Sequence, residues 1–324
     1  MTESDRQYGA GTVEHSARES KLFAADGKKS GHGTIAWLPA PAYEMPVGPL
    51  WQPSPRPPVI ALLDTGVRQH PWLPEGGEQP FVLQAEDYGW QSPIPDDAAP
   101  DADEDYRSHW GHATFIAGLI RLAAPSAQVL SMRVMKSDGK VSEDDAADAL
   151  YWLADSREAP GIDIVLMAFG RQDDPGDYDL EKLRAPIKKL SDRGVRLVAS
   201  AGNDGAERPV YPAAFAAEPE LSYQSQRAVI SVGALASPTE RAPYSNSGPW
   251  VAEWRRGTNI ISIMPLTTKS SDDHTPDSDA ASAPASGNGY AWWSGTSFAA
   301  AVAAGKLAAS LPPGQARPES AGGP

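Results

Sequence analysis

The chain has 324 residues, among them 29 Gly, 31 Pro and no Cys. This length allows one large domain or two small ones, and it is sufficient to bury a hydrophobic core. Without cysteine there is no disulfide, no zinc–thiolate or iron–sulfur site and no thiol nucleophile, so hydroxyl, carboxylate and imidazole groups must carry any chemistry.

The charge balance argues against nucleic acid and membrane surfaces as partners. Lys and Arg number 28 and Asp and Glu number 42, which gives a net charge of -14. Such an excess of negative charge repels phosphate backbones and anionic lipids. No basic start followed by an apolar run opens the chain, and no stretch is long and apolar enough to span a bilayer, which favours a cytoplasmic protein. Export by a non-standard route stays open.

An N-terminal arm rich in Pro and Gly is expected over residues 1–57, because prolines crowd residues 49–58 and favour an extended chain. From residue 58 onward, short apolar, β-branched runs alternate with segments of helical period, which is typical of βαβ units around a parallel sheet. The expected strands cover residues 59–63, 129–134, 162–169, 195–199, 228–232 and 259–264.

Two amphipathic helices are expected between these strands. Residues 142–155 carry apolar side chains at helical spacing behind Ser142 as the N-cap. Residues 180–190 show the same period, and Pro186 predicts a kink or a weak point there. The predicted fold class is therefore α/β, a doubly wound, mostly parallel sheet with helices on both faces.

A single domain is expected over residues 58–310. Within it, residues 266–289 are rich in Ser, Asp, Ala and Pro and predict a flexible insertion, and residues 311–324 predict a disordered tail.

The first candidate for chemistry is Asp64, in the run VIALLDTGV. The carboxyl end of a strand in an open α/β sheet faces the functional crevice, although a turn residue is the alternative interpretation. The triplet D-T-G is also the aspartic-protease signature, but such enzymes need two carboxylates that share a proton. The chain has no second such triplet, and its βα alternation does not suit an all-β protein.

Two histidines compete for the role of a base. In HWGHATFIAGLI, His112 opens an apolar, helix-like run whose small residues allow close packing, and His109 lies three residues earlier. A purely structural histidine is the alternative. The run GHGT at residues 31–34 resembles a catalytic motif, but it precedes Asp64 and prolines stop a helix after it, so we assign it to the arm.

Two further polar side chains follow predicted elements. A strand runs into SAGNDG, where the amide of Asn203 could donate a hydrogen bond to a developing oxyanion, although the same run is a good turn. In WWSGTSFAAA, Ser297 leads into an Ala-rich helix. A serine there is usually a cap, but a helix N-terminus also offers N–H groups and positive potential to an anion.

Taken in chain order, Asp64, His112, Asn203 and Ser297 supply every part of an acyl-transfer site. With these residues and the motifs around them, the chain resembles the subtilisin-like serine proteases, or subtilases, over about residues 59–309. The motifs in order are DTGV, GHATFIAG, SAGNDG, YPAAF, SVGAL, YSNSGP and SGTSFAAA. The resemblance implies a serine endopeptidase with Asp64, His112 and Ser297 as its triad. It also implies an oxyanion hole formed by the Asn203 amide and the Ser297 backbone N–H. A catalytically silent subtilase fold that binds peptides or scaffolds an assembly is the alternative.

The resemblance further implies that a peptide or protein substrate pairs as an extended strand with Gly139 on one side and with Ala168, Phe169 and Gly170 on the other. Ala168 stands where the family usually has Ser, which alters the pocket. The acidic run at residues 143–145 suggests a preference for Lys or Arg in the substrate, and its alternative role is to complement a helix dipole.

No cofactor is required by this chemistry. Many subtilases hold structural calcium, which makes the acidic segment 96–105 a candidate, with a solvated loop as the alternative. Since no signal peptide is evident and the arm is shorter than the usual subtilase pro-domain, processing of a specific precursor peptide is slightly favoured over bulk degradation.

Overall fold

The structure, a computed structural model, describes residues 21–24, 36–37, 56–77, 80–95, 109–172, 180–223, 226–266 and 289–311. For residues 21–24, 36–37, 222–223 and 226 it describes the backbone alone. The predicted insertion at 266–289 and the tail at 311–324 lie almost entirely outside the described residues, as do residues 31–34 and 96–105.

Seven parallel strands form the central sheet, in the order β14-β13-β9-β7-β3-β5-β4. Every neighbouring pair in it is parallel. Its strands are β3 (Val59–Asp64), β4 (Val82–Gln84), β5 (Gln128–Arg133), β7 (Ile164–Met167), β9 (Arg196–Ser200), β13 (Val229–Leu235) and β14 (Glu253–Arg256). The predicted parallel α/β sheet is confirmed, and its strands end along one edge.

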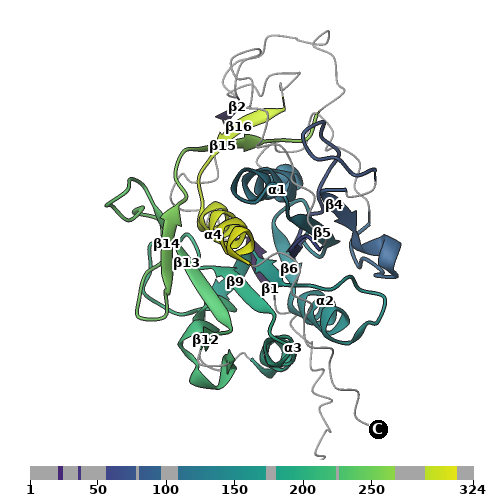
Figure 1. Ribbon diagram of the computed structural model, residues 1–324. Helices are drawn as coiled ribbons and strands as arrows, with labels where there is room; N and C mark the ends of the chain where they lie inside the picture. Colours follow the sequence, from purple (N-terminus) through teal and green to yellow (C-terminus); the bar gives the residue numbers. More distant parts are fainter. Residues whose placement is uncertain are drawn as a thin grey trace, which may run out of the picture.

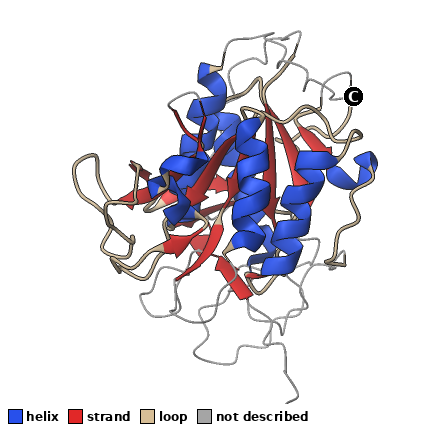
Figure 2. Ribbon diagram, turned by 90° about the horizontal axis from the view of Figure 1, so that it is seen from below, coloured by secondary structure: helices blue, strands red, loops and turns tan. Residues whose placement is uncertain are grey.

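Helices cover both faces of this sheet, as Figure 2 shows. They are α1 (His112–Ala123), α2 (Glu143–Asp155), α3 (Glu181–Asp192) and α4 (Thr296–Ser310). Successive side chains of a strand point to opposite faces. In β3, Ala61 and Leu63 accordingly pack in the core with α2 and α3, whereas Ile60 and Leu62 pack in the core with α1 and α4. This two-sided burial explains why the strand is apolar throughout.

The two predicted amphipathic helices are present with small differences. Ser142 is the N-cap residue of α2, as predicted, and has an extended backbone, but its side chain makes no capping hydrogen bond. Helix α3 continues through Pro186, which lies buried inside it.

The apolar run at 162–169 does not form one strand. It divides at Ala168 into β7 and β8 (Phe169–Gln172), and β8 belongs to a second, antiparallel sheet of order β10-β8-β1-β6. The other strands of that sheet are β1 (Lys21–Ala24), β6 (Lys140–Ser142) and β10 (Val210–Tyr211). The chain therefore leaves the parallel sheet at Ala168, which is one of the residues predicted to bind substrate.

A third sheet has the order β15-β16-β2, and a two-stranded ribbon joins β11 and β12. Their strands are β2 (Ala36–Trp37), β11 (Ser222–Tyr223), β12 (Gln226–Arg227), β15 (Ile260–Ile263) and β16 (Tyr290–Trp293). Short 3-10 helices cover Ala85–Tyr88, His109–Gly111, Ala213–Ala217 and Pro219–Leu221. Within the described ranges, no helix has both the length and the apolar character needed to cross a membrane.

Helices α1 and α4 lie side by side (Figure 1) and are packed closely. At Gly305 of α4, a Cβ atom would lie 2.6 Å from the Cβ of Ala123 and 3.4 Å from the backbone of Ile120, both in α1. A side chain larger than that of glycine would therefore force the two helices apart at this point.

Candidate active site

Asp64 is the last residue of β3 and is fully buried. Its Oδ1 accepts hydrogen bonds from the backbone N–H of Thr65 at 2.7 Å and from the Thr65 hydroxyl at 3.2 Å. The Thr65 hydroxyl oxygen in turn accepts the backbone N–H of Ala113 at 3.2 Å. A buried carboxylate keeps one orientation when several donors bind its oxygens at once.

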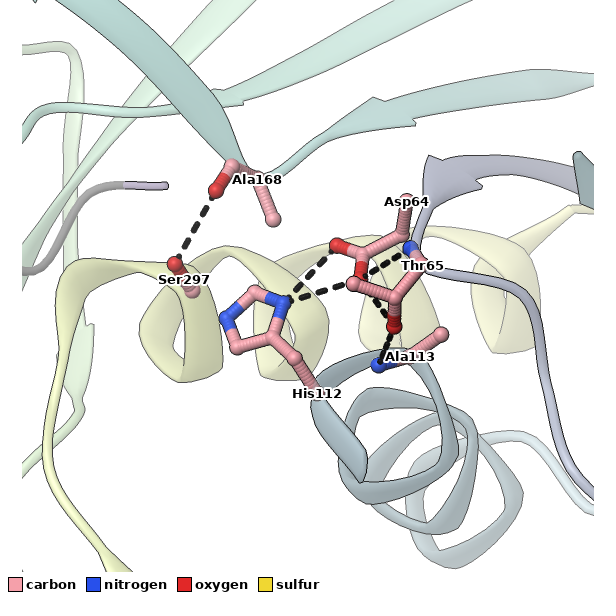
Figure 3. A network of polar contacts seen from close by, with 6 residues as sticks. All are labelled: Asp64, Thr65, His112, Ala113, Ala168 and Ser297. Carbon is pink, nitrogen blue, oxygen red and sulfur yellow. Dashed lines mark hydrogen bonds and ion pairs between the residues drawn. The ribbon is translucent and has the colours of Figure 1, made fainter. Parts of the chain in front are cut away.

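His112 is the first residue of α1, and its Nδ1 lies 2.9 Å from both carboxylate oxygens of Asp64. Because a carboxylate only accepts hydrogen bonds, Nδ1 carries the proton in this contact. The other ring nitrogen points toward Ser297, so that the imidazole lies between the carboxylate of Asp64 and the hydroxyl of Ser297 (Figure 3). His112, and not His109, makes the contact with Asp64.

Aromatic rings enclose the imidazole of His112. The ring of Trp293 meets it edge-on at 5.4 Å, the ring of Phe298 lies at 5.5 Å and that of His109 at 5.5 Å, all measured between centroids. Only 2% of His112 is exposed. These contacts hold the ring plane and exclude water around it; His109 is thus part of the packing around His112.

Ser297 is the second residue of α4 and is 2% exposed. Its hydroxyl donates a hydrogen bond to the carbonyl oxygen of Ala168 at 3.1 Å (Figure 3). This carbonyl belongs to the residue at which the chain passes from β7 to β8. The division of the predicted strand therefore brings a backbone acceptor to the hydroxyl.

Asn203 lies in the loop after β9 and is buried. Its Oδ1 accepts the backbone N–H of Thr296 at 2.9 Å, and the Thr296 hydroxyl accepts the backbone N–H of Gly202 at 3.1 Å. With Oδ1 fixed in this way, Nδ2 lies beside Gly295, where a Cβ atom would be 3.4 Å from it. The amide donor of Asn203 is thus held next to the start of α4.

Asn246 was not singled out from the sequence, yet it holds the Asn203 loop. It is fully buried; its Oδ1 accepts the backbone N–H groups of Asp204 at 3.0 Å and Ala206 at 2.9 Å, and its Nδ2 donates to the carbonyl of Ala201 at 3.0 Å. The one signal for it was its place in the motif YSNSGP, which does not reveal which backbone groups it contacts.

Tyr244 of the same motif is also buried, and its hydroxyl donates to the carbonyl of Gly257 at 2.8 Å. Burial raises the pKa of Tyr244 to about 12, because the charged phenolate is poorly solvated there. The neutral hydroxyl supports the loop before β15.

The residues predicted to bind substrate lie at β6 and β8, the two strands that flank β1. Phe169 and Gly170 are in β8, Ala168 immediately precedes it, and Gly139 immediately precedes β6. A Cβ atom on Gly139, whose φ is +81°, would lie 2.6 Å from His109 Nδ1. The turn that contains Gly139 therefore lies directly against the ring of His109.

Cationic partners face Glu143 and Asp144, which belong to the acidic run that suggested a preference for basic substrates. Glu143 is buried and lies 3.6 Å from Arg171 of β8, and Asp144 lies 2.7 Å from Lys182. The charges on which that prediction depends are therefore partly compensated.

Within the described parts of the chain, no three His, Asp or Glu side chains gather as they would around a metal ion. The acidic segment 96–105, the candidate for calcium, lies outside them.

A carboxylate, an imidazole and a helix-start hydroxyl at one edge of a parallel α/β sheet are the arrangement of a subtilisin-like serine protease. The chain belongs to the subtilase family, whose model matches residues 56–314. Among curated proteins it is 29% identical over 197 residues to "Thermophilic serine proteinase" of Bacillus sp. (strain AK1), a match that covers 61% of this chain and 38% of the relative. The chain thus spans well under half of that relative.

The fold is shared with solved structures, among them two proteases. The protease domain of PatA matches with a TM-score of 0.56 and 23% identity, covering 78% of both chains. A lanthipeptide protease matches with a TM-score of 0.54 and 20% identity, covering 78% of this chain and 72% of the other.

Proposed function

We propose that this chain is a serine endopeptidase that hydrolyses peptide bonds through an acyl-enzyme, with Asp64, His112 and Ser297 as its catalytic triad. The observation that carries this proposal is the placement of the His112 ring, which is bound through Nδ1 to Asp64 and faces Ser297 with its other nitrogen. Membership of the subtilase family supports it.

In this mechanism Asp64 fixes the tautomer of His112. With the proton on Nδ1, the lone pair of Nε2 faces the hydroxyl of Ser297 and can take its proton as the oxygen attacks the substrate carbonyl. His112 then gives the proton to the leaving amine. A water molecule, activated by the same nitrogen, releases the acid product and restores Ser297.

The negative charge that develops on the carbonyl oxygen needs donors held in place. The Nδ2 group of Asn203 and the backbone N–H of Ser297 supply them, and the N-terminus of α4 adds positive potential. Loss of one such donor typically lowers kcat by about 100- to 1,000-fold.

The substrate is expected to bind as an extended strand between β6 and β8, where backbone groups give affinity and side-chain pockets give selectivity. We propose a specific precursor peptide as the natural substrate. The fold shared with a lanthipeptide protease supports this choice.

A fluorophosphonate probe tests the chemistry directly, because it reacts with an activated serine. We expect the folded full chain to be labelled and Ser297→Ala to lose the label. Ser294→Ala is the matched control: this serine lies three residues earlier and its Oγ accepts the backbone N–H of Asn259 at 2.9 Å. This variant should be labelled like the parent.

The alternative is a catalytically silent subtilase fold that binds peptides. Absence of labelling in the folded parent would favour it and would contradict the proposed activity. Cleavage-site profiling with a peptide library then tests the precursor hypothesis: one dominant sequence context is expected, and indiscriminate cleavage would count against it.

A further inference from the structure

A second histidine, His109, lies buried beside the proposed base, and the mechanism gives it no role. The centroid of its ring lies 5.5 Å from that of His112, and the two ring planes meet at 64°. Only 8% of His109 is exposed. A charge on one of two groups this close disfavours a charge of the same sign on the other. The protonation of His109 therefore bears on that of His112.

The backbone and a neighbouring turn hold His109 in place. Its N–H donates a hydrogen bond to the carbonyl of Ser137 at 2.5 Å. A Cβ atom on Gly139 would lie 2.6 Å from Nδ1 of His109, so this turn leaves the ring no room in that direction. The separation between the two imidazoles is thus fixed by the fold.

Trp293 of β16 packs against both imidazoles. Its ring centroid lies 6.0 Å from that of His109 and 5.4 Å from that of His112, and only 2% of the residue is exposed. Little water therefore reaches the place where the three rings meet. Because water screens charges more strongly than a protein interior does, a charge on His109 acts on His112 more strongly than it would in solution.

Other charged or titratable groups belong to the elements around His109. Among the described residues they include Lys136, Asp138 and Lys140 of the turn, Arg68 over the ring of Trp110, Asp64 of β3 and Tyr290 of β16. Asp138 forms an ion pair with Lys140, and Tyr290 lies against the ring of His70. Lysine, arginine and aspartate keep their charges between about pH 5 and 8, whereas a histidine changes its charge there.

We propose that His109 acts on the reaction through His112: a proton on His109 opposes a proton on Nε2 of His112 and so keeps His112 available as the base at lower pH. The base can accept the proton of Ser297 only while Nε2 carries none. Two rings coupled in this way take up protons in successive steps. The proposal rests on the proposed function only in giving His112 the role of the base.

His109→Phe and His109→Gln test this coupling, because both remove the charge and the first keeps an aromatic ring. For charges 5.5 Å apart and an effective dielectric constant of about 20 to 80, Coulomb's law corresponds to a displacement of about 0.5–2 pH units. The acid limb of kcat/KM should move to higher pH by this amount in both variants. Above about pH 8, kcat/KM should stay close to that of the parent, because a histidine carries little charge there.

His70→Gln is the matched control. It removes another buried histidine, whose ring lies 5.9 Å from that of Tyr290, and it should leave the acid limb unchanged. Thermal unfolding shows whether each variant is folded. An unchanged acid limb in the folded His109 variants would overturn the proposal. A loss of kcat/KM that is the same at every pH would also overturn it, since that is the effect of a purely structural residue.

NMR titration of the imidazole signals in a Ser297→Ala background measures the same coupling without hydrolysis. The titration midpoint of His112 should rise in both His109 variants. Should neither variant fold, the Ser297→Ala chain decides: the signals of His112 should follow two steps, one of them shared with His109, and a single independent step for each ring would contradict the proposal. Failure of fluorophosphonate labelling would reject the proposed function and leave this titration intact.

Discussion

Thr65 is expected to couple the acid of the site to the helix that carries the base. Its hydroxyl donates to Asp64 Oδ1 and accepts the N–H of Ala113, the second residue of α1. The first N–H groups of a helix have no partner within it, and Gly111, which precedes α1, has no side chain to cap it. Thr65 supplies that cap from the end of β3, while it holds the carboxylate.

Thr65→Val keeps the shape of the side chain and removes both hydrogen bonds. Loss of a helix cap costs about 0.5–2 kcal/mol, and the buried N–H of Ala113 is left without its acceptor. We therefore expect the free energy of unfolding to fall by about 1–2 kcal/mol. The same change leaves Asp64 and His112 less well aligned. If this raises the activation free energy by the same amount, about 1–2 kcal/mol, kcat should fall by roughly 5- to 30-fold, with little change in KM.

Urea denaturation and peptide-hydrolysis kinetics measure the two effects, and Thr65→Ser is the control because it keeps the hydroxyl. The reasoning would be refuted if the Val and Ser variants had the same kcat and the same stability.

Three further predictions concern the surroundings of the site. Asn246→Ala leaves the buried backbone groups that Asn246 satisfies without a partner, so the free energy of unfolding should fall by about 2–5 kcal/mol and kcat should fall with it; unchanged urea midpoints would contradict this. Gly202→Ala should lower kcat, because φ is +97° and its Cβ would clash with Asn246 Nδ2, whereas Gly77→Ala, with the same φ and open space, should reduce stability only. Because the pKa of Tyr244 is raised to about 12 in the folded chain, its contribution to stability is fully present below about pH 10. This contribution, about 3 kcal/mol for a shift of two pKa units, should be lost as the pH rises from 10 to 12. The free energy of unfolding of Tyr244→Phe should depend less on pH in this range.

Much of the fold follows from local patterns. The strand that ends at Asp64 and the helices that begin near His112 and Ser297 are long periodic or apolar segments, and such segments constrain their own structure. Because parallel strands end at one edge, the ends of β3 and β9 were expected to bring Asp64 and Asn203 together. The expectation that His112 and Ser297 join them depended on the resemblance to the subtilases.

Other features depend on partners that local patterns do not reveal. The run at 162–169 is apolar on both sides of Ala168, since β7 and the start of β8 are both buried, so nothing in it marks the change of sheet. The contact of Thr65 with Ala113 spans 48 positions of the sequence, and the backbone contacts of Asn246 span 40 to 45. The pairing of Lys21–Ala24 could not be predicted either, because a four-residue strand in a polar arm carries no distinct period.

The glycine contact between α1 and α4 has a consequence for catalysis at a distance. His112 and Ser297 stand at the first turns of these two helices, and Gly305 lies eight residues beyond Ser297, roughly 12 Å along the axis at 1.5 Å per residue. The spacing between His112 and Ser297 is thus set partly by a residue remote from both side chains. A bulky side chain at position 305 would separate α1 from α4 and so change the distance between their first turns. The rate of such a protein can therefore change during divergence through the interface between these helices, while every reacting group stays the same.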